Sequence, residues 1–84
     1  MNNKVCVELI VPAIEERYNV FIPINKKTLE IIYLLSKSIH EMSNGFFEIS
    51  NTVSLINGST GLNYDVDKTF LENGILNGSK IILM

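Results

Sequence analysis

The sequence holds very few of the residue types from which chemical sites are built. Its 84 residues include one cysteine, Cys6, and one histidine, His40. An internal disulfide is therefore excluded, and a zinc site, which needs three or four converging ligands, is not expected. Cys6 also has no adjacent basic residue to activate its thiol, so it is a poor candidate nucleophile. We expect no metal, no cofactor and no enzymatic activity.

Charge of one sign and long hydrophobic runs are lacking as well. Seven Lys and Arg against nine Asp and Glu give a net charge of −2, which offers no attraction for nucleic acid or an anionic membrane. The longest apolar runs are too short to span a bilayer, so direct membrane insertion is not expected. Glu8 interrupts the first apolar run, and no small-residue cleavage site follows it. This favours a first strand over a signal peptide, and a cytoplasmic protein.

Two short motifs resemble catalytic sequences but lack the required context. Gly78-Ser79-Lys80 is part of a phosphate-loop motif, yet a strand is expected after it where that motif needs a helix. Glu15 and Glu16 are adjacent, whereas paired catalytic carboxylates must face each other across a substrate. We therefore interpret Glu15-Glu16 as a solvated loop and reject a phosphate loop at Gly78-Ser79-Lys80.

What the chain does have is an apolar content of 46 %, sufficient for one globular domain over residues 1–84. Apolar residues alternate with others from Lys4 to Val11 and again from Tyr18 to Ile24, the spacing of half-buried strands. Because a short connection, Pro12 to Arg17, joins them, we expect an antiparallel hairpin. Pro23 has no amide hydrogen and should lie at a strand end or an edge.

A single long helix is expected from Thr28 to Ser43. Its apolar residues recur every three or four positions and predict a buried stripe made of Leu29, Ile32, Leu35, Ile39 and Met42. Thr28 is the expected N-cap, and Asn44-Gly45 the left-handed stop.

The remaining chain predicts shorter elements. In the loop from Asn44 to Thr52, we expect Phe46, Phe47 and Ile49 to tuck under the sheet. A strand from Val53 to Ile56, a very short one around Leu62 and Tyr64, and a last one from Lys80 to Met84 follow. Thr69 to Glu72 has the pattern of a capped helical turn that Asn73-Gly74 ends.

This order of elements, β-β-α-β-(β)-turn-β, resembles the β-grasp of ubiquitin. Thr28-Leu29 at the helix start, Leu55-Ile56, the segment from Thr69 to Ile75, and the inward Ile81 and Leu83 match corresponding features there. The resemblance implies an α+β fold, a ubiquitin-like β-grasp with a mixed sheet of four to five strands packed on one long helix.

Within that superfamily, the segment from Phe70 to Ile81 is similar to the small YukD/EsaB proteins, bacterial ubiquitin-like proteins associated with type VII secretion. Ser79 stands where that family often has aspartate. The resemblance implies a non-catalytic, non-conjugated adaptor or regulator whose protein partner is a type VII secretion component. It also implies recruitment to the inner face of the membrane by that partner.

Two other functions are open alternatives. Ubiquitin and its sulfur-carrier relatives act through a C-terminal Gly-Gly, and this chain ends Ile82-Leu83-Met84 with no internal Gly-Gly. A carrier in a conjugation or sulfur-transfer pathway is therefore disfavoured. The second alternative is a structural domain that associates with itself as a homodimer.

The candidate binding residues follow from strand alternation. If Leu55, Ile81 and Leu83 point inward, then Ile56, Ile82 and Met84 point outward on neighbouring strands and form an apolar patch that would bind a partner. Alternatively, the Phe46-Phe47 loop covers the patch, or these residues only reflect strand propensity. Two weaker candidates for partner contact are Leu34, outside the main helix stripe, and Phe21, outward on the second strand.

Overall fold

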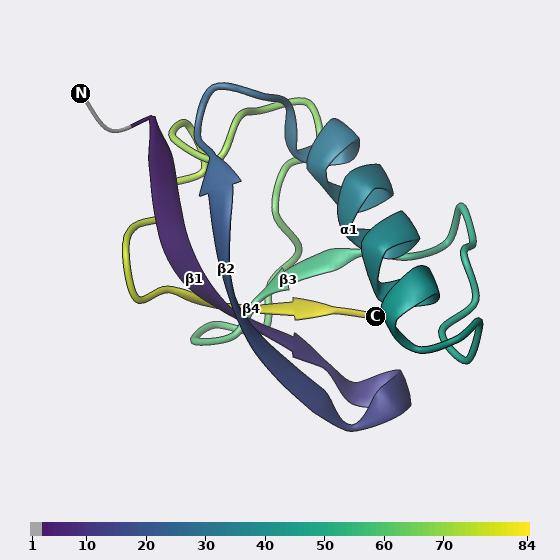
Figure 1. The fold of residues 1–84 in the computed structure, drawn as a ribbon. Helices are drawn as coiled ribbons and strands as arrows, with labels where there is room; N and C mark the ends of the chain where they lie inside the picture. Colours follow the sequence, from purple (N-terminus) through teal and green to yellow (C-terminus); the bar gives the residue numbers. More distant parts are fainter. Residues whose placement is uncertain (1–2) are drawn as a thin grey trace.

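A computed structural model describes residues 3–84, which form one four-stranded sheet with a long helix across one face (Figure 1). The sheet order is β2-β1-β4-β3. The topology is the expected α+β ubiquitin-like β-grasp. Its elements in chain order are β1 (Lys4–Val11), the 3₁₀ turn η1 (Pro12–Ile14), β2 (Glu16–Pro23), α1 (Thr28–Met42), β3 (Leu55–Asn57) and β4 (Lys80–Leu83).

Strands β1 and β2 form the predicted antiparallel hairpin, paired from Lys4↔Pro23 to Val11↔Glu16. The connection is tight because η1 is followed by Glu15 in the left-handed region, at φ 53°. Pro23 is the last residue of β2, an outer strand, so its missing amide hydrogen interrupts no central ladder.

Strand β4 lies in the interior of the sheet, parallel to β1 and antiparallel to β3. The sheet is therefore mixed, with four strands. In the region expected to carry a further short strand, a single bridge joins Ile56 to Asn63, and Leu62 is exposed. With one bridge and no buried alternation, residues 60–67 run as a loop.

The helix α1 buries a different stripe from the one expected. Its buried residues are Thr28, Ile31, Ile32, Ser36 and Ile39, while Leu35 is partly buried. Leu29, 58 % exposed, and Met42, 57 % exposed, lie outside the core. Both stripes have a spacing of three and four and share Ile32 and Ile39. Because spacing does not separate them, a choice based on hydrophobicity alone selected the wrong stripe. The buried set includes two polar residues that a hydrophobic count does not detect.

Thr28 is not the helix cap, as expected, but the first helical residue, and Lys27 occupies the cap position. The Thr28 hydroxyl, fully buried, donates to the Lys68 carbonyl at 2.7 Å and accepts from Asn73 Nδ2 at 3.0 Å. Thr28 therefore joins the start of α1 to a segment that lies 40 to 45 residues later in the chain.

The end of α1 agrees with the predicted left-handed stop. Asn44 and Gly45 have φ values of 55° and 83°, and the Gly45 amide donates to the His40 carbonyl at 2.8 Å.

Of the three apolar residues expected to tuck under the sheet, only Phe47 is buried, while Phe46 is 80 % exposed and Ile49 is also exposed. The Phe47 backbone is held at both ends: its carbonyl accepts from His40 Nδ1 at 2.7 Å, and its amide donates to Ser43 Oγ at 2.9 Å. This fixation selects Phe47 and leaves its neighbours outside the core. His40, the one histidine in the sequence, is half-buried and anchors the loop through this bond.

The core lies between α1 and the sheet face that α1 covers, and it includes residues from all four strands, the helix and the loops. Among residues 3–84 it has thirteen buried apolar side chains, those of Val7, Leu9, Val11, Ile22, Ile31, Ile32, Ile39, Phe47, Leu55, Phe70, Ile75, Ile81 and Leu83. Ile81 and Leu83, expected to point inward on the last strand, are both buried, and in β1 the alternating Val7, Leu9 and Val11 are buried while Val5 is partly buried.

Candidate functional site

The sheet face away from α1 carries three isoleucines in one row. Strand register pairs Ile10 of β1 with Ile82 of β4, and Ile82 with Ile56 of β3. Paired residues point to the same side of a sheet. The adjacent residues that point to the helix side are buried, namely Leu9, Val11, Leu55, Ile81 and Leu83. The row therefore crosses three adjacent strands on the uncovered face, where each isoleucine is half-buried by its neighbours.

Met84 extends this row along the direction of β4. It follows the buried Leu83, so alternation places its side chain on the same face as Ile82, and it is 58 % exposed. Its backbone is fixed because Met84 and Ser54 exchange hydrogen bonds of 3.1 and 2.6 Å. We call Ile10, Ile56, Ile82 and Met84 together the sheet-face patch.

Sequence reasoning missed Ile10, although a signal was available. The alternation of β1 places Ile10 opposite Leu9 and Val11, and it is the sole apolar side chain besides Cys6 on the outward positions of β1. What could not be read from the sequence is the parallel pairing that sets Ile10 beside Ile82.

Charged residues border the sheet-face patch. Arg17 of β2 is the register partner of Ile10 of β1. Lys80 of β4 is the register partner of Glu8 of β1. The Arg17 guanidinium lies 3.9 Å from the carboxylate of Glu8, which is half-buried, and this partly exposed pair contributes little to stability. The result is an apolar centre with a charged border, the usual anatomy of a protein interface.

In the Phe46-Phe47 loop, the alternative cover expected for the patch, the Phe46 side chain is exposed. Phe46 and Met84 line one groove together with Pro12 and Ala13 of η1. Since Phe46 and Met84 both stay more than half exposed, the groove continues the apolar surface beyond the sheet.

The two weaker candidates, Phe21 and Leu34, lie on a different surface. They line one hollow between β2 and α1, with Ile31 and Leu35 among its other residues. Phe21 and Leu34 are both exposed, and β2 is an outer strand of the sheet. The structure therefore places Phe21 and Leu34, which the sequence suggested as separate candidates, at one hollow.

The residues with catalytic chemistry do not converge. Among residues 3–84, no group of three histidine, cysteine or acidic side chains is placed to hold a metal ion. Cys6 is a free, half-buried cysteine on β1. Its backbone amide donates a hydrogen bond of 2.8 Å to Asn77 Oδ1. Over the same residues, no helix is both long and apolar enough to cross a bilayer.

Two pKa shifts lie outside the sheet-face patch. The pKa of Glu72 is lowered, chiefly because the Thr69 amide donates to its carboxylate at 2.9 Å, with a further contribution from the Thr69 side chain. Burial raises the pKa of the Tyr64 hydroxyl. Neither group faces the patch through strand register, so we assign neither a role in binding.

No protein-family model matches the chain, and no curated protein matches it either. Several solved structures do match. The ubiquitin-like domain of EccD5 from Mycobacterium xenopi has a TM-score of 0.79 at 12 % identity, covering 99 % of this chain and 94 % of that one. The ubiquitin-like domain of the Mycobacterium tuberculosis type VII secretion system protein EccD1 has a TM-score of 0.67 at 12 % identity, covering 100 % and 99 %.

A third similar structure is the N-terminal ubiquitin-like domain in the 4931431F19Rik protein, with a TM-score of 0.75 at 19 % identity, covering 100 % of this chain and 76 % of that one. At such identities the likeness extends to the fold and no further. The chain has a ubiquitin-like fold, and its structural neighbours include EccD domains of type VII secretion.

Proposed function

We propose that this protein is a non-catalytic ubiquitin-like adaptor that binds a protein partner through the sheet-face patch. The observation that carries the proposal is the register-matched row of Ile10, Ile82 and Ile56 on the face that α1 leaves uncovered. Three isoleucines lie on one face of three neighbouring strands, with an exposed methionine beside them. Burial of this apolar surface by a partner would lower its free energy.

The finer part of the proposal is a role as an accessory or regulator of bacterial type VII secretion, as in the YukD/EsaB family. Its supports are the resemblance of residues 70–81 to that family and the EccD domains among the structural neighbours. The partner is then a component of the secretion machinery that recruits this protein to the inner face of the membrane.

Binding would proceed by burial of a small apolar centre inside a charged border. The apolar centre consists of four side chains, so the interface falls in the size range of weak or transient association. Arg17, Glu8 and Lys80 would affect orientation and association rate more than affinity.

The test is a pull-down from the native host with the tagged protein and its Ile56→Asp variant. Ile56 is half-buried at an outer strand, so the folded state should tolerate the change while the apolar surface is interrupted by a charge. We expect the parent to capture secretion-machinery proteins and the variant to lose about tenfold or more of that capture.

The matched control is Leu71→Asp, which places the same charge at an exposed leucine in the turn before Gly74, away from β1, β3 and β4. Circular dichroism must show that both variants are folded. Binding retained by Ile56→Asp would exclude the sheet-face patch, and capture of an adenylating enzyme would favour the carrier alternative.

The hollow between β2 and α1 is a second candidate surface, because Phe21 and Leu34 are exposed on either side of it. Leu34→Asp in the same pull-down tests it separately. Loss of binding in that variant, with Ile56→Asp unaffected, would assign the adaptor role to this surface.

A further inference from the structure

Four of the five glycines in the chain directly follow an asparagine, and the fold gives these four pairs different surroundings. An asparagine before glycine can lose its side-chain nitrogen when the glycine amide nitrogen attacks Cγ, because glycine has no Cβ to hinder that approach. Since the reacting groups are the same in every pair, the fold decides which pair reacts first. The four pairs are Asn44-Gly45, Asn57-Gly58, Asn73-Gly74 and Asn77-Gly78.

The glycine amides alone do not separate the four pairs, because each donates one hydrogen bond to a backbone carbonyl. In chain order the acceptors are the carbonyls of His40, Lys80, Leu71 and Cys6, at 2.8 to 3.0 Å. The bond from Gly45 to His40 differs in its position, since it closes the last turn of α1. Helix ends open more readily than the contacts inside a fold, so this amide is the one released at the lowest cost.

Two of the asparagine side chains are held by several hydrogen bonds. Asn57 Oδ1 accepts from the Ser59 and Thr60 amides at 2.8 and 3.3 Å. Asn73 Nδ2 donates to three acceptors, and its Oδ1 accepts from the Asp65 amide at 3.1 Å. Rotation of either side chain onto the following amide would break these bonds.

Asn77 and Asn44 are both exposed, and they differ in their partners. Asn77 Oδ1 accepts from the Cys6 amide at 2.8 Å, and the Gly78 amide donates to the Cys6 carbonyl at 2.8 Å, so both reacting groups are attached to β1. The Asn44 side chain has no hydrogen-bond partner within residues 3–84. Its rotation onto the Gly45 nitrogen therefore breaks no side-chain bond.

From these differences we propose that Asn44 is a site of spontaneous deamidation, and that it reacts faster than the other three Asn-Gly pairs. The Gly45 nitrogen gives its proton to solvent and bonds to Asn44 Cγ, while the Cγ–Nδ2 bond breaks and Nδ2 leaves as ammonia. Water then opens the succinimide ring. Cleavage of the new N–Cγ bond gives aspartate, and cleavage of the bond from nitrogen to the main-chain carbonyl carbon gives isoaspartate. One water is consumed and one ammonia is released, with no oxidant or reductant.

The products alter the segment that fixes Phe47 in the core. Aspartate at position 44 places a carboxylate at the C-terminal end of α1, where the helix dipole disfavours negative charge. Isoaspartate lengthens the main chain between Ser43 and Phe47, which are joined by a hydrogen bond of 2.9 Å from the Phe47 amide to Ser43 Oγ. This modification does not depend on the adaptor function proposed above.

The first test incubates the folded protein at mildly alkaline pH and follows every asparagine by peptide mapping with mass spectrometry. We expect Asn44 to convert about threefold or more faster than Asn57, Asn73 and Asn77, the factor that one hydrogen bond can contribute. Both aspartate and isoaspartate should form at position 44. Equal or faster conversion at another Asn-Gly pair, or aspartate without isoaspartate, would overturn the proposal.

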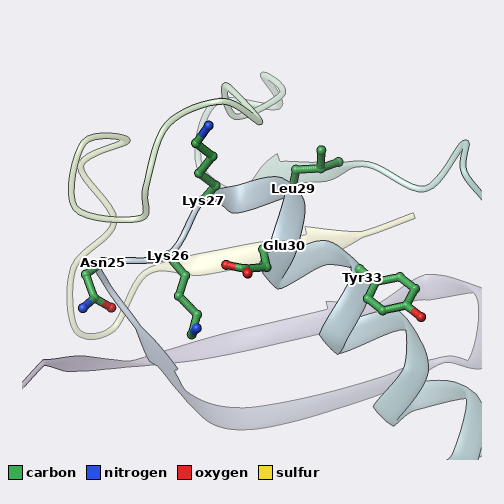
Figure 2. A pocket seen from close by; sticks show the side chains of 6 residues that line it. All are labelled: Asn25, Lys26, Lys27, Leu29, Glu30 and Tyr33. Carbon is green, nitrogen blue, oxygen red and sulfur yellow. The ribbon is translucent and has the colours of Figure 1, made fainter.

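Asn25 is a matched control in the same chain. Its side chain is exposed and, in the part of the chain that the structure describes, has no hydrogen-bond partner. Figure 2 shows it on the segment that leads into α1, at a hollow that it lines with Lys26. Because Lys26 has a Cβ, Asn25 should stay unmodified while Asn44 converts. Conversion of Asn25 at the rate of Asn44 would show that exposure alone suffices, against the proposal.

The same measurement in urea separates the effect of the fold from that of the neighbouring sequence. Unfolding frees the side chain of Asn77, so the ratio of the Asn44 rate to the Asn77 rate should fall by about threefold or more. A ratio that urea leaves unchanged would assign the reactivity of Asn44 to its sequence neighbours and overturn the role of the structure.

The effect of the product is tested with Asn44→Asp beside Asn25→Asp. The two variants add the same charge beyond opposite ends of α1, so the helix dipole disfavours the first and favours the second. We expect Asn44→Asp to melt at a lower temperature than the parent and Asn25→Asp to melt at the same or a higher one. An Asn44→Asp variant as stable as Asn25→Asp would contradict this effect.

Discussion

At the scale of single residues, Thr69 and Glu72 are joined by two reciprocal hydrogen bonds between side chain and backbone. The Thr69 amide donates to Glu72 Oε1 at 2.9 Å, and the Glu72 amide donates to Thr69 Oγ1 at 3.1 Å. This capping box closes the turn that precedes the buried Ile75. Because the carboxylate form accepts the hydrogen bond, the pKa of Glu72 lies below its usual value of 4.5.

A pH dependence follows from that direction. A lowered pKa in the folded state contributes stability that is fully present above about pH 4.5 and is lost as pH falls through the folded-state pKa of Glu72. We expect an NMR titration of the Glu72 carboxyl carbon to give a lower pKa in the folded protein than in the urea-unfolded chain. Thr69→Ala keeps the amide that donates to Glu72 and removes only the smaller side-chain contribution, so it should raise the folded pKa slightly and leave it below the unfolded value. A folded pKa of Glu72 equal to that of the unfolded chain would contradict this assignment.

The local chemistry of this turn could be predicted from the sequence, whereas the role of Thr28 could not. Thr69 and Glu72 are three residues apart, so the pattern alone suggests their contact. Thr28 has the residue type of a helix cap, but its partners are Lys68 and Asn73, and no local signal connects residues 40 positions apart.

Gly58 fills a position where two backbones approach closely. A Cβ atom there would lie 2.8 Å from the Lys80 carbonyl oxygen and 2.9 Å from Lys80 Cβ. We expect Gly58→Ala to lower the free energy of unfolding by about 1–3 kcal/mol, because backbone must shift to admit the methyl group. Urea denaturation measures this, with Ser59→Ala at the next, exposed position as the control. A loss no larger than that of Ser59→Ala would contradict the close approach.

At the scale of elements, α1 is attached to residues 65–73 by a buried polar contact rather than by apolar packing alone. Asn73 Nδ2 donates to Thr28 Oγ1 and to the Asp65 carbonyl at 2.9 Å, and the Leu29 amide donates to the Val66 carbonyl at 3.0 Å. These bonds fix the first turn of the helix relative to the loop. They also hold Leu29 in its exposed position.

A double-mutant cycle tests this attachment. Thr28→Val removes the hydroxyl at nearly constant volume, and Asn73→Ala removes its donor. Each should lower the free energy of unfolding by about 1–3 kcal/mol. The two effects should deviate from additivity by about 1 kcal/mol, because one hydrogen bond is shared. Additive losses would show that the two residues act independently.

Most elements were predictable because their signals are local. Strands β1 and β2 alternate, and α1 ends at an Asn-Gly pair. The buried face of α1 was not predictable in this way, because the polar Thr28 and Ser36 occupy core positions that Leu29 and Met42 were expected to take. The candidate site was predictable in part: alternation predicted Ile56, Ile82 and Met84 as outward, but the addition of Ile10 required the strand order.

At the scale of the whole molecule, the chain is as compact as a folded domain of its length. The Cα radius of gyration is 11.9 Å, against about 12 Å expected for 84 residues. Helix α1 covers one face of the sheet (Figure 1), and strand register places the sheet-face patch on the other face.

We expect the isolated protein to sediment as a monomer of 9.5 kDa. The sheet-face patch has few apolar side chains inside a charged border, less than a stable dimer usually buries. Outer strand β3 has only three residues, and outer strand β2 ends at a proline, so edge pairing is disfavoured. Sedimentation velocity measures this. A dimer that Ile56→Asp dissociates would contradict it and favour the self-associating alternative.

The interior position of β4 has a consequence for how the chain is made. The ribosome synthesises β4 after β1, β2, α1 and β3, yet β4 is the strand that joins β1 to β3. A nascent chain lacking it has no continuous sheet, and Ile10 and Ile56 have no Ile82 between them. The sheet-face patch therefore forms only when synthesis has passed residue 84, so a partner that recognises it selects chains that contain β4 over chains that lack it.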